Sequence, residues 1–414
     1  MDISAKTAQA AAPLMSARRV GIIGAMLVAI GPVSLALYTP AMPQIVQAFG
    51  TTDAAVKLTV SLYFAGFAFS QLICGPLSDA LGRRPVTFAF MVIYAVASFL
   101  AVLAPSVDIL IIARFLQGFG GAVGVAVSRA LVRDLFTHEQ SARIMNLMGI
   151  ILAAGPALAP TLGGVTMELA GWHAIFVIMF VWGLVVILLV HLFMRETITP
   201  DLSRMRPGSL LRSYGALMKS PYFITSSMVV AGAIGAMYTQ ATLLPFILMD
   251  RVGLSPAAFG IGMIMQSGTY FLGSLSMGFL LRRFSAFRLV PAGLFFIALG
   301  SGMLCFILNS GPPTFLRVMV PVAVYVFGVA YVMPAMMTAA LAPFPHMAGA
   351  ASALSGFAQM ASGLIGGIVA ALISDPVFAL SLVIPGLGTI AIVSWLIWRT
   401  LPEPALAGQV THTE

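Results

Sequence analysis

The sequence predicts an all-α membrane protein with twelve transmembrane helices, arranged as two pseudo-symmetric six-helix bundles around a central cavity. Composition, the length of the apolar runs and the placement of the basic residues predict this class. The chain has 414 residues, of which 60% are hydrophobic and 8% charged, whereas a soluble domain carries about 25% charged residues. The apolar runs are continuous rather than alternating, which favours membrane-spanning helices over a β-barrel.

Apolar runs of about 20 residues are long enough to cross a bilayer. On that measure we expect spans at 20–41, 54–78, 86–104, 108–132, 141–166, 172–194, 222–249, 256–281, 287–308, 314–342, 348–374 and 377–399. With both termini in the cytoplasm, nearly all Lys and Arg residues fall on the cytoplasmic side, as the positive-inside rule requires. Only Lys57, Arg251 and Arg317 fall at the outer boundary, and Arg114 lies inside a span.

The longest polar stretch, 195–220, divides the chain into two halves with six spans each. We expect a cytoplasmic tail at 1–19, a six-helix bundle at 20–194, a cytoplasmic linker at 195–220, a second bundle at 221–400 and a cytoplasmic tail at 401–414. The halves resemble each other: Gly163–Gly164 corresponds to Gly366–Gly367, Glu196 corresponds to Glu403, and GFLLRRFSAFR from Gly278 is a degraded copy of GPLSDALGRRP. Such duplication predicts a site between the halves, near the membrane midplane.

The stretch GPLSDALGRRP, 75–85, forms a short basic loop between two spans. Asp79 and the pair Arg83–Arg84 can bridge helix ends there, and Arg133 and Asp134 at the end of the fourth span are candidate partners. The alternative is a loop that only sets topology through its positive charge.

Four stretches, in order, resemble the major facilitator superfamily, and within it the twelve-span drug:proton antiporters of the bicyclomycin and chloramphenicol resistance type. GPLSDALGRRP is similar to the loop motif after the second span, with Gly75, Asp79, Gly82, Arg83 and Arg84 at motif positions. ARFLQGFGGA, 113–122, resembles the fourth-span motif through Arg114, Gln117 and Gly118. GPALAPTLGG, 155–164, resembles the fifth-span motif associated with antiporters, and GWHAIF, 171–176, resembles the aromatic start of the sixth span.

The resemblance implies a role for each motif. Asp79 and Arg83 would form a latch between helix ends when the protein faces outward. Arg114 would serve proton coupling or substrate binding; the alternative is that it snorkels to the outer headgroups. Gly155, Pro156, Pro160, Gly163 and Gly164 would form a hinge at the interface between the halves, or would simply allow close helix packing.

One position departs from the family pattern. The first span of this family usually carries an acid just before a Tyr-x-Pro stretch, but here that position is Ala36, and no Asp or Glu lies deep in any span. Proton coupling would then run through Asp79, Asp134 or an acid at a membrane boundary, or would be absent. Without a buried acid, a site for strongly cationic drugs is poor, and neutral or zwitterionic compounds such as phenicols fit better.

Several polar or aromatic side chains within the spans are cavity candidates, although some will only tie helices together. They are Tyr38, Tyr63, Tyr238, Gln240, Gln266, Tyr270, Tyr331 and Gln359.

The predicted function is secondary active export of drug-like, neutral or zwitterionic small molecules across the bacterial inner membrane, in exchange for protons. The alternatives are a uniporter or symporter of a metabolite, and a membrane sensor or scaffold without transport. The sequence has no phosphate-binding GxxxxGK[ST] motif, no metal-ligand cluster and no nucleophile–base pair, which argues against an enzyme. We expect no cofactor other than the proton gradient as energy source, no metal and no nucleic-acid partner. The expected partners are the substrate and the lipid bilayer, and the chain is expected to be monomeric.

Overall fold

The computed structural model describes residues 14–136, 138–202 and 207–402, and the regular structure in these ranges is helical. Ten helical stretches of the described chain are long and apolar enough to cross a membrane, and one of them, Val107–Leu135, consists of two consecutive helices. Another of them, α7 (His138–Phe193), contains two passes, because the backbone at Gly171 has a φ of 74° and interrupts the helix. Another helix, α10 (Pro256–Leu280), is not among the ten but has 25 residues, which is long enough to cross a membrane. Counting both passes of α7 and including α10 gives twelve passes.

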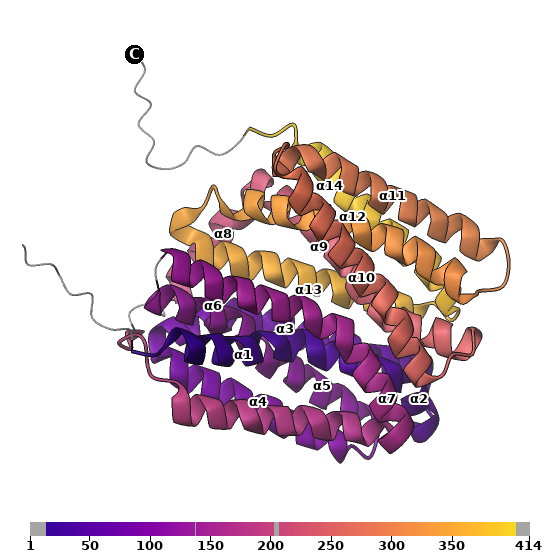
Figure 1. Cartoon of the computed structure of the whole chain (residues 1–414), viewed down its shortest axis with the longest axis horizontal. Helices are drawn as coiled ribbons and strands as arrows, with labels where there is room; N and C mark the ends of the chain where they lie inside the picture. The colour runs from indigo at the N-terminus through magenta and orange to yellow at the C-terminus, as the bar shows by residue number, and fades with distance from the viewer. Residues whose placement is uncertain (1–13, 137, 203–206, 403–414) are drawn as a thin grey trace, which may run out of the picture.

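The helices pack in two groups, the first in the lower part and the second in the upper part of Figure 1. The first group comprises α1 (Ala17–Tyr38), η1 (Thr39–Ala41), α2 (Met42–Phe49), α3 (Asp53–Leu81), α4 (Arg83–Val102), α5 (Val107–Gly121), α6 (Val123–Leu135) and α7. The second comprises α9 (Pro221–Pro245), η3 (Phe246–Arg251), α10, α11 (Ala286–Asn309), α12 (Phe315–Leu341), η4 (Pro345–Met347), α13 (Ala348–Leu372) and α14 (Pro376–Trp398). Each group has its own large cluster of buried apolar side chains.

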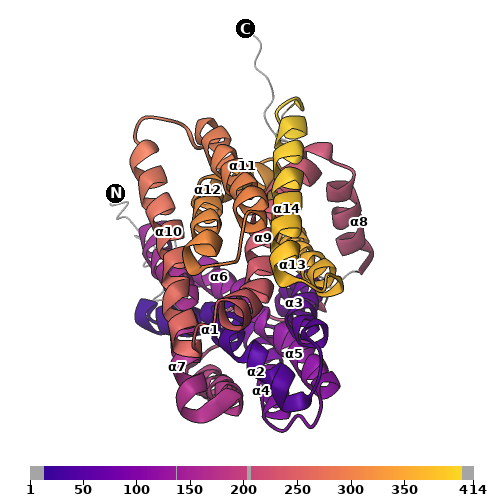
Figure 2. The same cartoon turned by 90° about the vertical axis from the view of Figure 1, so that its right-hand side faces the viewer.

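Between the groups, the polar stretch expected to be a simple linker contains a helix, α8 (Pro207–Met218). This helix lies beside the second group (Figure 2). The hydroxyl of Tyr214 in α8 donates to the carbonyl of Leu72 in α3, at 2.8 Å. Sequence composition missed α8 because its Gly, Ser and basic residues suit an exposed turn equally well. We call the end of the molecule with this segment and the α3–α4 turn the linker end, and the opposite end the far end.

The start of most helices follows from a local signal in the sequence. Seven helices of the described chain begin after a Ser, Thr or Asp whose side chain accepts a backbone N–H of the first turn: Ser16, Thr52, Ser106, Ser220, Ser255, Thr314 and Asp375. Such N-caps pair amide groups that the helix itself leaves free. The helices therefore begin near the ends of the apolar runs.

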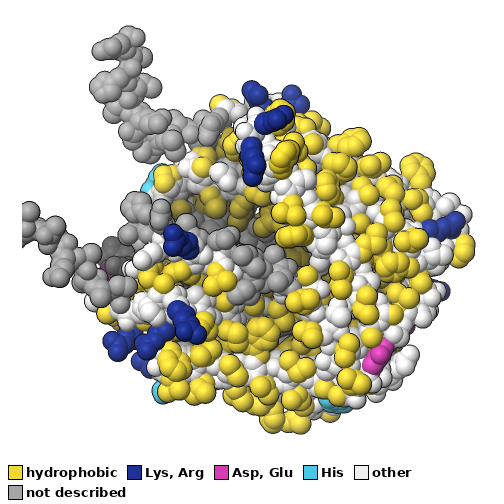
Figure 3. All heavy atoms as spheres, in the orientation of Figure 1, with side chains coloured by type: hydrophobic (Ala, Val, Ile, Leu, Met, Phe, Trp, Pro, Cys, Tyr) yellow, Lys and Arg dark blue, Asp and Glu magenta, His cyan; other side chains and the backbone are white. Residues whose placement is uncertain are grey.

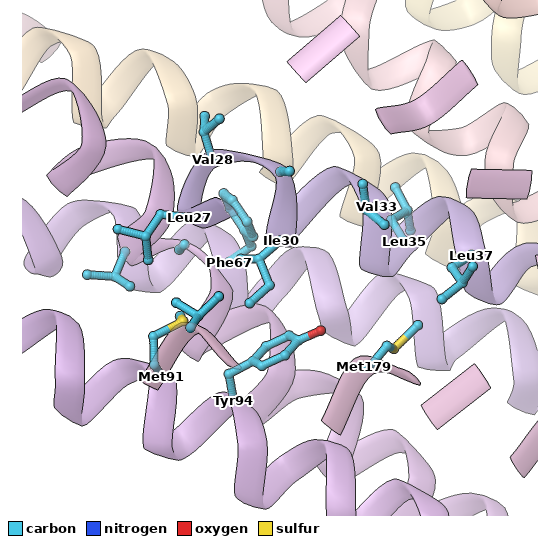
Figure 4. Close-up of a cluster of buried hydrophobic side chains, with 14 of the residues drawn as sticks. Leu27, Val28, Ile30, Val33, Leu35, Leu37, Phe67, Met91, Tyr94 and Met179 are labelled. Carbon is cyan, nitrogen blue, oxygen red and sulfur yellow. The ribbon is translucent and has the colours of Figure 1, made fainter. Parts of the chain in front are cut away.

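The core of the first group forms around α1, which is buried along most of its length. Figure 4 shows Phe67, Met91 and Tyr94 near Ile30, so side chains of α3 and α4 reach the core around α1, whose backbone packs chiefly against α6 and α7. The Tyr94 hydroxyl lies 2.6 Å from Ser34 Oγ, which gives each polar group a partner inside the bundle. This core fixes the helices that carry the sequence motifs described above.

Two helix pairs join the groups. Helix α3 contacts α13, with Ser61 near Gly367 toward the far end and Gln71 near Gly356 toward the linker end. The first pass of α7 contacts α10, where Thr161 Oγ1 donates to the carbonyl of Gly260 at 3.0 Å. These two pairs place the interface between the groups along the middle of the molecule.

Candidate functional site

The turn between α3 and α4 contains the first sequence motif. Gly82 has φ 107° and ψ 149°, a conformation available essentially only to glycine. The carboxylate of Glu196 accepts the backbone N–H of Arg83 at Oε1 (2.9 Å) and that of Arg84 at Oε2 (3.1 Å). A Cβ atom at Gly82 would lie 2.5 Å from Glu196 Oε2. Glycine is therefore required both by the backbone angles and by the acid that caps α4.

A charge cluster surrounds the buried side chain of Arg83. Its NH1 lies 2.5 Å from Asp79 Oδ1 and donates to Ser78 Oγ at 2.7 Å, and its Nε lies 3.1 Å from Asp134 Oδ2. The hydroxyl of Thr197 donates to the same Asp134 oxygen at 3.2 Å. The cluster thus joins α3, α4, α6 and the segment after α7, all on one side of the interface between the groups.

Three residues of the predicted latch motif lie outside this cluster. Arg84 NH2 donates to the carbonyl of His191 at 2.7 Å. Arg133 is exposed on α6, and Gly75 lies within α3 with open space around its Cα. In the described part of the chain, Asp79 and Asp134 form ion pairs with Arg83.

A second site surrounds Arg114 on α5, whose side chain is completely buried. Its guanidinium carbon lies 4.4 Å from the ring centroid of Tyr38 and 4.3 Å from that of Tyr63, so the cation is held between two aromatic rings. Cation–π attraction is strongest where water is excluded. The Tyr38 hydroxyl pairs with Thr59 Oγ1 at 2.7 Å, and the Tyr63 hydroxyl donates to the carbonyl of Gly31 at 2.8 Å. Both rings are thereby fixed in place.

The guanidinium of Arg114 uses only some of its hydrogen-bond donors. Arg114 NH1 donates to Gln117 Oε1 at 2.8 Å, and Gln117 Nε2 donates in turn to Ser98 Oγ at 2.8 Å. The Nε and NH2 atoms of Arg114 have no hydrogen-bond partner. Within the described ranges no carboxylate forms a salt bridge with it. A buried arginine with free donors and no counter-ion is suited to bind an acceptor group or an anion.

Close helix packing brings this site together. A Cβ atom at Gly118 would collide with the backbone carbonyl of Tyr63, and one at Gly66 would collide with that of Phe115. Small residues at these two positions let α3 and α5 approach closely. Gly118 lies four residues after Arg114, about one helical turn away, and therefore sets how near the Tyr63 ring comes to the guanidinium.

Described acidic residues lie near helix ends rather than in the middle of a span. Asp53 and Asp108 are in the first turns of α3 and α5, Asp375 caps α14, and Asp250 lies near the end of η3. Ala36 is a partly buried residue of α1 packed against the core of the first group. The departure at Ala36 leaves Arg114 without an acid from the first span.

The fifth-span motif lies in α7, where the backbone is helical from Gly155 to Gly164. A Cβ atom at Gly155 would lie 2.8 Å from Val33 Cγ2, and one at Gly163 would lie 3.0 Å from Pro40 Cγ, both on the α1 side. A Cβ atom at Gly164 would lie 3.0 Å from Ala257 Cα of α10, across the interface. This geometry supports the close-packing interpretation; the side chain of Pro156 lies outside the described part.

Comparison with known proteins agrees with these motifs. The model of the Major Facilitator Superfamily matches residues 22–367. The chain belongs to the major facilitator superfamily. It is 30% identical to an MFS-type transporter of Bacillus subtilis (strain 168), YdgK, over 84% of this chain and 86% of that relative. It is 29% identical to multidrug resistance protein D of Escherichia coli (strain K12), over 90% of this chain and 93% of that relative. It is 28% identical to multidrug resistance protein MdtL of Shewanella sp. (strain ANA-3), over 82% and 85%.

Solved structures of this superfamily share the fold. A bacterial homologue of the human lysosomal transporter Spinster has a TM-score of 0.71 at 16% identity, covering 92% of this chain and 96% of that one. A D-xylose–proton symporter has a TM-score of 0.70 at 13% identity, covering 94% and 98%. The predicted fold class is confirmed. The chain is a multi-pass membrane transporter and not an enzyme.

The remaining cavity candidates of this transporter fall into two sets. Tyr238 lies near the first group, with its ring centroid 4.8 Å from that of Phe64, the neighbour of Tyr63. Gln266 Nε2 donates to Gln240 Oε1 at 2.7 Å, and Gln240 Nε2 is buried without a partner. Tyr238 thus lies at the contact with the first group, whereas Gln240 and Gln266 form a buried polar pair between α9 and α10 within the second group.

The other candidates lie in contacts that tie helices together. The Tyr331 hydroxyl lies 2.7 Å from Ser276 Oγ, joining α12 to α10, and the Tyr270 hydroxyl donates to Met333 Sδ at 3.4 Å. Gln359 Nε2 donates to the carbonyl of Ser355 in its own helix, at 3.2 Å. The contacts of Tyr331 and Tyr270 thus join α10 to α12, and that of Gln359 stays within α13.

The transporter is closed at its far end, where α7 and α10 touch. The carboxylate of Glu168 accepts the backbone N–H of Ala257 at 3.0 Å, next to the Gly164 contact. Farther along α10, toward the linker end, Gly268 and Gly278 have open space around them. Figure 3 shows the surface hollowed between the two groups on the linker-end side, beside atoms that are not described.

Sequence reasoning missed two features of the site. Glu196 was noted only as one of a pair of repeated acids, yet it caps α4; its partner Glu403 lies outside the described residues. The position of Glu196 directly after a span is the only sequence signal for it. The sandwich of Arg114 between Tyr38 and Tyr63 had no signal, because the three residues come from three different helices.

Proposed function

We propose that this transporter belongs to the bicyclomycin and chloramphenicol resistance type and exports drug-like, neutral or zwitterionic small molecules in exchange for protons. Transport follows alternating access, with the site between the two halves. Both termini lie in the cytoplasm and the chain acts as a monomer. The relatives named multidrug resistance proteins support export.

The observation that carries the proposal is the unpaired guanidinium of Arg114. A cationic drug would meet a buried positive charge that no carboxylate balances, which costs free energy. A carbonyl, nitro or carboxylate oxygen on a neutral or zwitterionic drug can instead accept from Nε and NH2, two donors that are otherwise free. The Tyr38 and Tyr63 rings add an aromatic surface next to those donors.

Proton exchange needs an acid whose protonation changes during transport. With Ala36 in the first span, the candidates are Asp79 and Asp134 beside Arg83, and the acids at the far end. Proton binding to Asp79 or Asp134 would weaken the cluster that joins α3, α4 and α6. The protonation state of the cluster would in this way be linked to movement of the helix ends.

The test is efflux of chloramphenicol from cells that express the chain, with and without a protonophore. We expect efflux that stops when the protonophore is added. Arg114→Ala and Arg114→Lys should both reduce it at least about tenfold, because lysine retains the charge but has neither the planar donors nor the stacking of arginine. Arg133→Gln is the control, since Arg133 is exposed and outside the Arg83 cluster.

A second function remains a candidate because no described acid lies in the middle of a span. A uniporter or symporter of a small metabolite needs no proton antiport. Efflux that ignores the protonophore would favour a uniporter, and uptake without efflux would favour a symporter. The absence of flux for every compound tested would contradict both transport proposals.

A further inference from the structure

A groove of about 330 Å³ lies between α1 and the first pass of α7, toward the linker end. Ala17, Gly21 and Ala25 line it from α1, and Ile144 and Leu147 line it from α7. The three α1 residues are four positions apart, which places them on one face of the helix. Because these three side chains are small, they leave a recess in the surface of α1. Ile144 and Leu147 of α7 form its apolar wall.

Two arginines from different helices border this groove. Arg18 is in the first turn of α1 and Arg143 is in the first turns of α7, and both side chains are exposed. Among the described residues that line the groove, none is acidic. Figure 3 shows Lys and Arg side chains gathered toward the linker end of this face. The groove therefore combines an apolar channel with a basic mouth.

We propose that this groove binds one anionic phospholipid, with its phosphate between Arg18 and Arg143 and an acyl chain along Ala17–Ala25 and Leu147. The guanidinium group matches phosphate oxygens in geometry and charge. Basic pockets between spans at the membrane surface are typical sites for anionic headgroups. The apolar part lies on membrane-spanning helices, so the surrounding medium supplies hydrocarbon chains at that depth.

A second copy of the chain fits the groove less well than a lipid. In a symmetric dimer the same patch would face itself and bring two copies each of Arg18 and Arg143 close together. A phospholipid removes that repulsion and fills the recess as well. By bridging α1 and α7 it would hold together two helices of the first group at the end where the molecule is hollowed.

The first experiment measures lipid binding to the purified full chain. Native mass spectrometry is carried out with phosphatidylglycerol and with phosphatidylcholine of the same acyl chains. We expect one phosphatidylglycerol to be retained in preference to phosphatidylcholine and to raise the apparent Tm. The Arg18→Gln/Arg143→Gln variant should bind phosphatidylglycerol roughly 25-fold more weakly, about fivefold for each arginine removed.

The matched control is Arg282→Gln/Arg283→Gln. These two exposed arginines follow α10 at the same end of the molecule but belong to the other half. This control should bind phosphatidylglycerol as the unchanged chain does. Equal weakening in both double variants would mean that general surface charge attracts the lipid, and it would overturn the proposed site.

A third variant tests the groove apart from its charges. A Cβ atom at Gly21 would lie 3.6 Å from Leu147 Cδ2, an ordinary contact, so a larger side chain there enters the groove without a clash with the backbone. Gly21→Leu should lose the retained phosphatidylglycerol while its Tm in phosphatidylcholine stays unchanged. Retention of the lipid in this variant would overturn the proposal, as would an equal rise in Tm with inorganic phosphate alone.

Discussion

Asp134 lies on α6, and its Oδ2 atom is 3.1 Å from Nε of Arg83 on α4. Asp79, four residues before Arg83, pairs with the NH1 atom of the same guanidinium. Asp79 is close in sequence and could be expected to pair with Arg83 wherever the turn folds. Asp134 reaches Arg83 only because α6 packs beside α4. This second ion pair therefore depends on how the helices of the first group pack together.

Asp134→Ala should lower stability. It removes the ion pair with Arg83 and the bond from Thr197, and the exposed fraction of the Asp134 side chain is only 13%. Hydrogen bonds to a charged group contribute about 1.5–3 kcal/mol each when partly buried. We expect a lower apparent Tm in a thermal unfolding assay of the purified chain. Arg133→Ala, one residue away and exposed, should leave Tm unchanged; an equal drop in both variants would contradict the role of Asp134.

Gly82→Ala should be poorly tolerated and Gly75→Ala well tolerated. Alanine at position 82 would have to adopt an unfavourable φ of 107°, which costs of order 1–3 kcal/mol for the backbone alone. Its Cβ atom would also collide with the Glu196 carboxylate. Alanine at position 75 enters open space inside a helix, where it favours the helix by roughly 0.5–1 kcal/mol. Yield of folded protein and Tm, measured side by side, check the contrast. Similar values for the two variants would show that the α3–α4 turn adapts to a side chain.

Gly164→Leu should separate the two halves at the far end. A side chain there points at Pro256 and Ala257 of α10, across the interface. We expect transport to fall at least about tenfold, since the bulky residue prevents the closed far end from forming and overpacking typically costs about 1–3 kcal/mol. Gly268→Leu is the control, because position 268 on α10 has open space around it. Normal efflux in Gly164→Leu would show that closure at this contact is not required.

Tyr214→Phe should release α8 from α3. The hydroxyl donates to the carbonyl of Leu72 at 2.8 Å, and burial raises the pKa of Tyr214 to about 12, above the value of 10.0 for a free tyrosine. Its contribution is therefore fully present below pH 10 and is lost only as pH rises through about 12. Hydrogen exchange in α8 should be faster in the variant and, for the unchanged chain, the protection should be the same at pH 6 and pH 9. A loss of protection at pH 9 would contradict this assignment.

Prediction from sequence was accurate for structural features that depend on the residues of one continuous segment. Apolar runs located the membrane spans, because hydrophobic length is a property of one continuous stretch of the chain. The helix α8 was missed because it lies in a polar stretch and contains Pro, Gly and Ser, and because its packing against α3, α9 and α13 is not a local property of the sequence. Local composition carries no information about a contact with residues 140 positions away.

The sequence by itself determined that the chain is a polytopic helical membrane protein of the major facilitator superfamily, because hydrophobic length, positive charge at one side and ordered motifs are properties of the linear chain. It also determined that Arg114 has no acid in the first span. Only the tertiary structure decided that Tyr38 and Tyr63 enclose Arg114, that Glu196 caps α4, and that Asp134 pairs with Arg83. Each of these contacts joins different helices or segments, and their distances depend on how closely glycine lets the helices approach.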